Sequence, residues 1–208
     1  MEHDIPKWLD WAREIQAISQ TGLTFSQNDY DTQRYQRLGE IATEITSEHS
    51  NLEKAELLKN FMTQPGYATP KVDVRGAVLQ HDKILLVQEK IDKGWCMPGG
   101  WADVGETPSE CVAREFYEES GFHVKPKKII GIFDANRDGR PLEFYHAYKI
   151  IFLCEILGGA PTPSNETLAV DFFDFDHLPP FSHNRTNEKH ISVIQAFIEQ
   201  KSIGCVFD

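Results

Sequence analysis

Three glutamates in one predicted helix are the residues best suited to chemistry. Glu115, Glu118 and Glu119 stand at i, i+3 and i+4, so a helix places their carboxylates on one face. Mg²⁺ takes oxygen ligands and needs several negative charges nearby, so such a face can serve as a site for hard cations. The alternative is a solvated acidic face that Arg114 partly compensates.

The residues around the glutamates favour the metal site. Residues 99–122 read GGWADVGETPSECVAREFYEESGF, which fits G-x5-E-x7-R-E-U-x-E-E-x-G-U with U an apolar residue. If seven fixed positions each match at roughly 7 %, the joint chance is about one in 10⁸ per window. The matching residues are Gly100, Glu106, Arg114, Glu115, Phe116, Glu118, Glu119, Gly121 and Phe122.

The helix that carries the glutamates has well-marked ends. Thr107 and Glu110 have the spacing of a capping box, and Pro108 occupies the first helical position. Gly121 stands where a helix usually ends in a left-handed residue. The predicted helix therefore covers residues 107–120.

The region from Lys71 onward alternates between strand and helix patterns. A glycine-rich tight segment is expected at 94–101, and a turn at His81–Asp82. The predicted strands are 72–78, 84–88, 129–134, 143–156 and 168–175, and a last helix covers 186–200. This alternation predicts an α/β or α+β domain.

The N-terminal region has a helical period from Ile5 to Met62 and predicts three helices. Asp4 and Pro6 resemble an N-cap and a first-turn proline, and Gly22 a helix stop. Trp8 and Trp11 are expected to pack in a core or an interface. Residues 63–70 read as a linker, so we predict a helical domain over 1–66 and a second domain over 67–208.

Composition and charge exclude several classes of protein. The net charge is −11, and no basic stripe of the kind that grips a long nucleic acid is present. A small anionic substrate is compatible if metal ions screen its charge. The four cysteines have no C-x-x-C spacing, which indicates buried thiols in a reducing compartment. The acidic, amphipathic N-terminus does not resemble a signal peptide, so we expect a cytoplasmic protein.

On residues 99–122 the sequence resembles the Nudix hydrolases. The resemblance implies an α/β/α sandwich with a mixed sheet over roughly residues 70–205, and hydrolysis of a diphosphate linked to another moiety. It implies that Arg114 orients the glutamates and pairs with Glu106. The residues that it implies hold Mg²⁺ or Mn²⁺ are Glu115, Glu118, Glu119, the backbone carbonyl of Gly99, and Glu106. The general base is Glu119 or Glu166.

The whole chain resembles a bacterial Nudix group with an extra N-terminal domain. The segments that carry this resemblance are WLDWAREIQAISQTGLTF, VDVRGAV, WCMPGGWADVGE and HAYKIIFLCEILGG. The group includes CDP-choline pyrophosphatases. The resemblance implies hydrolysis of CDP-choline to CMP and phosphocholine, 3′-to-5′ trimming of RNA ends, and a homodimer. The alternative substrate is ADP-ribose or another nucleotide sugar.

Five further residues are candidates for substrate contacts. Arg75 either binds a phosphate or forms a surface ion pair at a strand edge, and Trp101 either stacks on a base or packs the loop. Asp103 either bonds the substrate or supports a turn. His146 and Tyr148 lie on a predicted strand with Lys149, and alternate members must face opposite sides.

A hypothesis of another class is a nucleotide sensor with a Nudix fold and no catalysis. It predicts eroded glutamates, and none of the matched positions is eroded. If its partner were DNA, it would also predict a basic helical region. Residues 1–70 instead carry six Lys or Arg against eleven Asp or Glu. The sequence therefore favours an enzyme.

Overall fold

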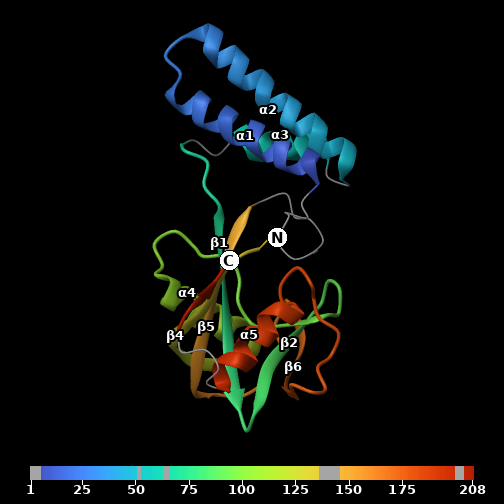
Figure 1. Cartoon of the computed structure of the whole chain (residues 1–208), viewed down its shortest axis with the longest axis vertical. Coiled ribbons are helices and arrows are strands. Elements are labelled where there is room, and N and C mark those ends of the chain that lie inside the picture. The colour runs from blue at the N-terminus through green and yellow to red at the C-terminus, as the bar shows by residue number, and fades with distance from the viewer. Residues whose placement is uncertain (1–5, 51–52, 63–65, 136–145, 200–203) are drawn as a thin grey trace. The chain divides into compact units, whose positions relative to one another are not determined.

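The computed structural model describes residues 6–50, 53–62, 66–135, 146–199 and 204–208 (Figure 1). The chain divides into two compact units: a helical one within residues 1–70, and one of Lys71–Ala135 with Ala147–Asp208. Within the described ranges, no helix is both long and apolar enough to cross a bilayer.

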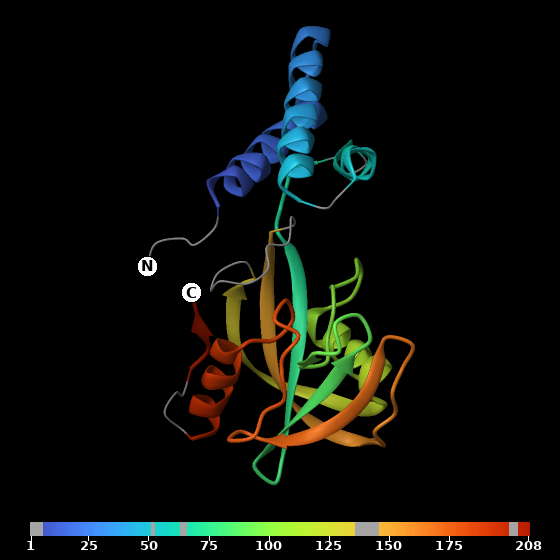
Figure 2. The same cartoon turned by 90° about the vertical axis from the view of Figure 1, so that its right-hand side faces the viewer.

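The helical unit consists of α1 (Lys7–Phe25), α2 (Asp29–His49) and α3 (Lys54–Met62), as the period predicts. The side chain of Asn28 caps α2 by accepting the amide of Asp31 at 2.8 Å. The side chains of Leu9, Ala12, Ala42 and Leu57 are buried in this unit. Figure 2 shows α1 and α2 as adjacent helices that cross at an angle.

Three predicted details of this unit need correction or restatement. Gly22 does not end α1, because the helix continues to Phe25. A Cβ at Gly22 would lie 2.3 Å from the ring of Tyr35, so this glycine serves the close approach of α2. Pro6 is the N-cap rather than a helical residue, and the predicted cap Asp4 lies outside the described residues. Trp11 is 57 % exposed in the single chain, so it does not pack in the core of this unit.

In the second unit, the described residues form a mixed sheet in the order β3-β2-β1-β5-β4-β7, with β6 paired to β2. Strand β1 is parallel to β5 and antiparallel to β2, so the predicted α/β class is confirmed. The strands are β1 (Lys71–Gln80), β2 (Lys83–Glu89), β3 (Trp95–Cys96), β4 (Phe122–Asp134), β5 (Ala147–Gly159), β6 (Thr167–Asp174) and β7 (Val206–Phe207).

Most predicted boundaries agree with the structure, and the differences have physical causes. His81 and Asp82 both have positive φ, as a tight hairpin turn requires. Strand β4 begins at Phe122 rather than 129, because register shifts interrupt its alternation. Residues 143–145 of the predicted strand 143–156 lie outside the described residues, and β5 is described from Ala147. Strand β7 was not predicted, since two residues carry no period.

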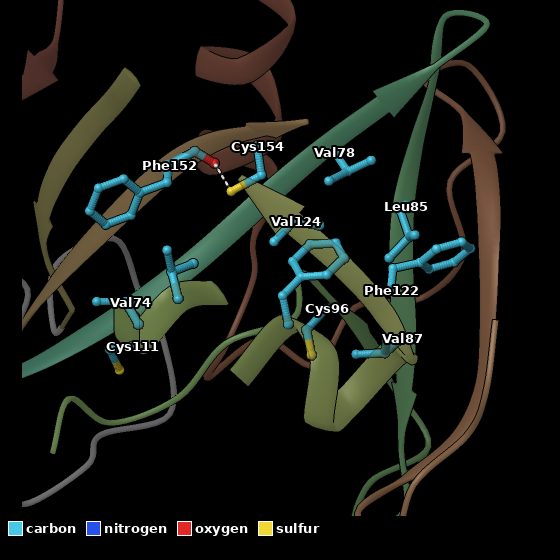
Figure 3. Packing of buried hydrophobic residues seen from close by; sticks show 12 residues of the cluster. Val74, Val78, Leu85, Val87, Cys96, Cys111, Phe122, Val124, Phe152 and Cys154 are labelled. Carbon is cyan, nitrogen blue, oxygen red and sulfur yellow. Dashed lines mark hydrogen bonds between the residues drawn. The ribbon is translucent and has the colours of Figure 1, made fainter. Parts of the chain in front are cut away.

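Helices α4 (Pro108–Ser120) and α5 (Glu188–Ile198) cover opposite faces of this sheet (Figure 2). On the α4 side, Val74 and Val78 of β1 point into a core with Phe122 and Phe152 (Figure 3). On the α5 side, Ala77 of β1 joins Ile130, Phe133, Ile151, Ile191 and Ile194. The alternation along β1 therefore assigns successive side chains to different layers. Each fully buried large apolar side chain contributes about 1.5–3 kcal/mol.

Candidate active site

The ends of α4 are as the sequence predicts. The Thr107 hydroxyl accepts the amide of Glu110 at 3.3 Å, and the Glu110 carboxylate accepts the amide of Thr107 at 2.9 Å. Pro108 is the first helical residue, and Gly121 ends the helix with a φ of 77°. The two caps fix the first and last residues of α4, whose C-terminal half carries the glutamates.

The glycine-rich segment before α4 runs beside β1. The amide of Val74 donates to the carbonyl of Gly100 at 2.9 Å, and the amide of Gly76 to that of Pro98 at 2.8 Å. Gly99 has a φ of 143°, and a Cβ there would lie 2.0 Å from the carbonyl oxygen of Val74. A Cβ at Gly100 would lie 2.6 Å from the carboxylate of Glu115. The two glycines let the backbone approach both the strand and the helix.

Glu119 is buried at the junction of this segment with α4, with 4 % of the residue exposed. Its carboxylate accepts the amide of Gly99 at 2.8 Å, and its carbonyl accepts the hydroxyl of Thr167 at 2.9 Å. Burial raises the pKa of Glu119 to about 7, although the charge of Arg75 and the Gly99 amide oppose this. A buried carboxylate of this kind is stabilised by a nearby cation.

Arg114 gathers the other box carboxylates. Its Nε and Nη2 donate to Glu106 at 2.7 and 2.9 Å, while Nη1 donates to Glu115 at 2.7 Å and to Glu118 at 3.0 Å. Hydrogen bonding to Arg114 lowers the pKa of Glu106, whereas burial raises the pKa of Glu115. Asp103 is exposed, and its carboxylate lies 3.4 Å from Arg114. One guanidinium therefore orders three glutamates around it.

The chemistry of these donors fits a hard divalent cation. Glu115, Glu118 and Glu119 supply carboxylate oxygens from neighbouring turns of α4, and the carboxylate of Glu119 accepts the backbone amide of Gly99. Within the described ranges, however, no three His, Cys, Asp or Glu side chains converge on a point that could hold a metal. The reason is that Glu115 and Glu118 turn to Arg114, while Glu119 turns to the Gly99 amide. Metal binding requires these carboxylates to exchange partners.

Arg75 is buried, not exposed at a strand edge, so its alternative as a surface ion pair is wrong. Strand β1 lies inside the sheet, between β2 and β5. The Nε of Arg75 donates to Asp73 at 2.8 Å, and its Nη1 to the carbonyl of Met97 at 3.3 Å. The buried Lys149 amine also donates to Asp73. The pKa of Asp73 is lowered, because these two cations outweigh the effect of its burial.

The remaining predicted contacts lie in different settings. Trp101 is exposed, and Lys71 Nζ lies 5.7 Å from the centroid of its ring. Tyr148 is exposed while Lys149 is fully buried, as the predicted alternation requires. His146 is half-buried, and Glu166 is exposed on the loop just before β6.

Comparison with known proteins assigns both units. The model of the NUDIX domain matches residues 69–197, more than half of the chain. This chain belongs to the Nudix family. A second model, described as a UDP-X-like N-terminal oligomerisation domain, matches residues 6–61. Both the Nudix identification and the extra N-terminal domain are thereby confirmed.

Individual Nudix relatives match this chain over two thirds of its length or more. The putative ADP-ribose pyrophosphatase YjhB of Bacillus subtilis is 37 % identical over 97 % of both chains. A crystal structure of a UDP-X diphosphatase is 30 % identical, covers 97 % of this chain and 98 % of its own, and has a TM-score of 0.64. An ADP-ribose pyrophosphatase from Streptococcus suis is 36 % identical over 67 % of this chain and all of its own, with a TM-score of 0.61. This Nudix protein is accordingly a pyrophosphohydrolase, and Nudix hydrolases generally use divalent metal ions.

Sequence reasoning missed, among others, two sets of ion pairs in the Nudix unit. One joins Asp73 to the cations of β1 and β5. The other joins Arg185 Nε to Glu89 Oε1 at 3.2 Å. The period-2 alternation that places Asp73 and Arg75 on one face was available in the sequence. No local pattern links Glu89 to Arg185, because their pairing depends on how the segment after β6 folds back.

Proposed function

We propose that this chain hydrolyses the diphosphate of a nucleoside diphosphate linked to another moiety, with Mg²⁺ or Mn²⁺ held by the box glutamates. The main support is that Arg114 and the Gly99 amide hold all of the box glutamates by hydrogen bonds near the C-terminal half of α4. Glu115, Glu118 and Glu119 are the proposed metal ligands, with the Gly99 carbonyl and Glu106 as further ligands. The bound ions would neutralise the diphosphate and activate water.

The chain's own residues have separable proposed roles. Arg114 orients Glu106, Glu115 and Glu118 by the hydrogen bonds described above. Arg75 stabilises the ionised form of the buried Glu119 by its charge. Because Asp73 and Met97 already engage the Arg75 guanidinium, a direct phosphate contact by Arg75 requires the exchange of a partner.

Two residues are proposed as the general base, Glu119 and Glu166. Glu119 is buried, and Glu166 is exposed on the loop whose next residue, Thr167, bonds the carbonyl of Glu119. This bond joins the start of β6 to the last turn of α4, which supports the preceding residue, Glu166, as a candidate. If Glu166 is the base, Glu166→Gln should lower kcat about 10²-fold or more while Mn²⁺ affinity is unchanged. If Glu119 serves, Glu119→Gln lowers kcat and Glu166→Gln does not.

Within this class we propose CDP-choline and ADP-ribose as the substrates to compare. CDP-choline is supported by the resemblance of the N-terminal and strand segments to the group with an extra domain. ADP-ribose is supported by two relatives, 36–37 % identical, that are named as ADP-ribose pyrophosphatases. Trp101, Asp103, His146 and Tyr148 are the proposed contacts beyond the diphosphate. Trp101 offers an exposed ring for stacking on a base.

A substrate panel tests the proposed function. Purified protein is assayed with Mg²⁺ or Mn²⁺ on CDP-choline, ADP-ribose, UDP-sugars, NADH and 8-oxo-dGTP, with products separated by chromatography. Glu119→Gln should lose turnover, whereas the exposed Glu155→Gln, which breaks a pair with Lys127, should not. Absence of turnover on every compound would refute the proposal. A hundredfold preference for ADP-ribose would refute CDP-choline.

Trimming of RNA 3′ ends is proposed only as a secondary activity. It rests on the resemblance, and the acidic charge of the chain opposes tight RNA binding. A NAD-capped RNA hydrolase of Vibrio parahaemolyticus is 29 % identical, but the match covers 44 % of that protein. The test incubates a 3′-labelled RNA and Mg²⁺ with the parent protein and, as a control, with Glu119→Gln. Only the parent protein should release the label.

We propose that the helical unit forms a homodimer through one face of α1. Trp11, Ile18 and Phe25 recur every seven residues and are 57 %, 47 % and 66 % exposed. An apolar stripe of this spacing suits a second helix, and the matched domain model is described as an oligomerisation domain. Ile18→Asp should produce a monomer by light scattering, while the exposed polar control Gln27→Asp should stay dimeric. A monomeric parent protein would refute this proposal.

A further inference from the structure

A turn between β6 and α5 carries an arginine close to the segment before α4. The amides of Arg185 and Thr186 both donate to the carbonyl of Ser182 at 2.9 Å. The Thr186 hydroxyl accepts the amide of Met97 at 2.9 Å, and Thr186 is fully buried. Met97 lies two residues before Gly99, so the turn is bonded directly to the backbone that reaches the glutamates.

A buried carboxylate fixes the guanidinium of Arg185. Arg185 Nε lies 3.2 Å from Glu89 Oε1, and the Cys96 thiol donates to the same oxygen at 3.2 Å. The side chain of Glu89 is 3 % exposed and that of Arg185 28 %. Among the described residues, this ion pair engages only the Nε end of Arg185. The two terminal amino groups thus remain for another ligand.

Hydrogen bonds place the turn that carries Arg185 beside the candidate metal ligands, because Thr186 bonds the amide of Met97 and the amide of Gly99, two residues later, bonds Glu119. The charges of Arg75 and Arg185 both lower the pKa of Glu119, while the charge of Glu89 raises it. Arg75 is buried, and its Nε donates a 2.8 Å hydrogen bond to the carboxylate of Asp73. Arg185 is therefore the accessible member of the two arginines beside Glu119. In a chain of net charge −11, an accessible cation beside the acidic cluster suits an anionic ligand.

We propose that Arg185 binds the diphosphate of the substrate through Nη1 and Nη2, and that Glu89 is its positioning residue. This inference rests on the proposed hydrolysis of a nucleoside diphosphate derivative. A guanidinium fork matches two phosphate oxygens better than a lysine amine does. Held beside Glu119, Arg185 would also stabilise the negative charge that shifts to the leaving phosphate during cleavage.

Kinetic and binding measurements on Arg185 variants test this role. Arg185→Gln should lower kcat/KM for ADP-ribose and CDP-choline about 30-fold or more at saturating Mg²⁺, and Arg185→Lys should recover part of it. By calorimetry, Arg185→Gln should bind inorganic pyrophosphate about tenfold more weakly. Lys83→Gln is the matched control, since it removes an exposed ion pair with Asp174 in the same unit. It should leave both quantities unchanged.

A second set of variants separates binding from folding. Because Arg185→Gln leaves Glu89 buried without its cation, Arg185→Gln/Glu89→Gln should restore the melting temperature but not the pyrophosphate affinity. Glu89→Gln alone should raise KM more than it lowers kcat. Unchanged pyrophosphate affinity in the double variant, with the parent protein active, would overturn the role of Arg185. If the parent protein cleaves no diphosphate yet binds pyrophosphate through Arg185, the proposed function fails and the anion site stands.

Discussion

The amide of Gly99 donates a 2.8 Å hydrogen bond to the carboxylate of Glu119, twenty residues further along the chain. This bond joins the glycine-rich segment to the last turn of α4 and holds a carboxylate in the interior. One amide does not replace the hydration that the carboxylate loses, so the pKa of Glu119 is raised to about 7. The ionised form of Glu119 is therefore unfavourable at this junction unless a cation lies nearby.

The first prediction concerns stability against pH. The folded-state pKa of Glu119 lies above its unfolded value of 4.5, so its stabilising contribution is complete below pH 4.5 and lost as pH rises through about 7. The loss amounts to about 3 kcal/mol at most. In EDTA, the free energy of unfolding measured in urea should fall more between pH 5 and pH 8 for the parent protein than for Glu119→Gln. Adding Mg²⁺ at pH 8 should reverse the loss. Parallel pH profiles of the two proteins would contradict this.

The second prediction concerns Arg114 and metal affinity. Arg114→Lys keeps the positive charge but cannot donate to Glu106, Glu115 and Glu118 together. Mn²⁺ affinity should fall about 10–100-fold, as measured by calorimetry, because the carboxylates lose their orientation. Arg37→Lys is the control, since Arg37 also pairs with two glutamates, Glu40 and Glu44, on the exposed side of α2. Equal Mn²⁺ affinity in both variants would show that Arg114 acts through charge alone.

The third prediction separates steric from conformational roles of glycine. Gly99→Ala combines a positive φ with a clash against the carbonyl of Val74 and should destabilise the fold by about 3 kcal/mol or more. Gly105→Ala has a positive φ in open space and should cost about 1 kcal/mol. Gly158→Ala has neither problem and should be nearly neutral. Chemical denaturation measures all three, and a different order of stabilities would contradict the assignment.

The fourth prediction concerns the cap of α4. Thr107→Ala removes the side chain that accepts the Glu110 amide, so the free energy of unfolding should fall by about 1 kcal/mol. Thr107→Ser retains the hydroxyl and should lose much less. If Thr107→Ala also lowers turnover beyond its effect on the folded fraction, the cap positions the glutamates. Equal stability of the two variants would indicate that Glu110 alone holds the helix end.

How much of the fold could be predicted depended on local signals. Capping residues and a period of 3.6 gave α4 its correct limits, since these are properties of adjacent residues. The prediction at Gly22 was wrong, because glycine can either end a helix or allow close packing of a neighbouring residue. Here it allows the close approach of the Tyr35 ring. Strand β7 was missed, since its two residues are strand only through their pairing with β4.

The sequence by itself determined the family, the position of α4 and the set of box carboxylates, because helical spacing alone puts Glu115, Glu118 and Glu119 on one face. Only the tertiary structure decided which charges meet. It buried Arg75 against Asp73, and it brought Arg185 to Glu89 from a distant turn. The sequence shows that Asp73 and Arg75 share a strand face, but their burial depends on strand order, and the pairing of Arg185 with Glu89 depends on the return of the chain after β6. For the same reason, the partner of each ionised group, and hence its pKa, follows from the fold.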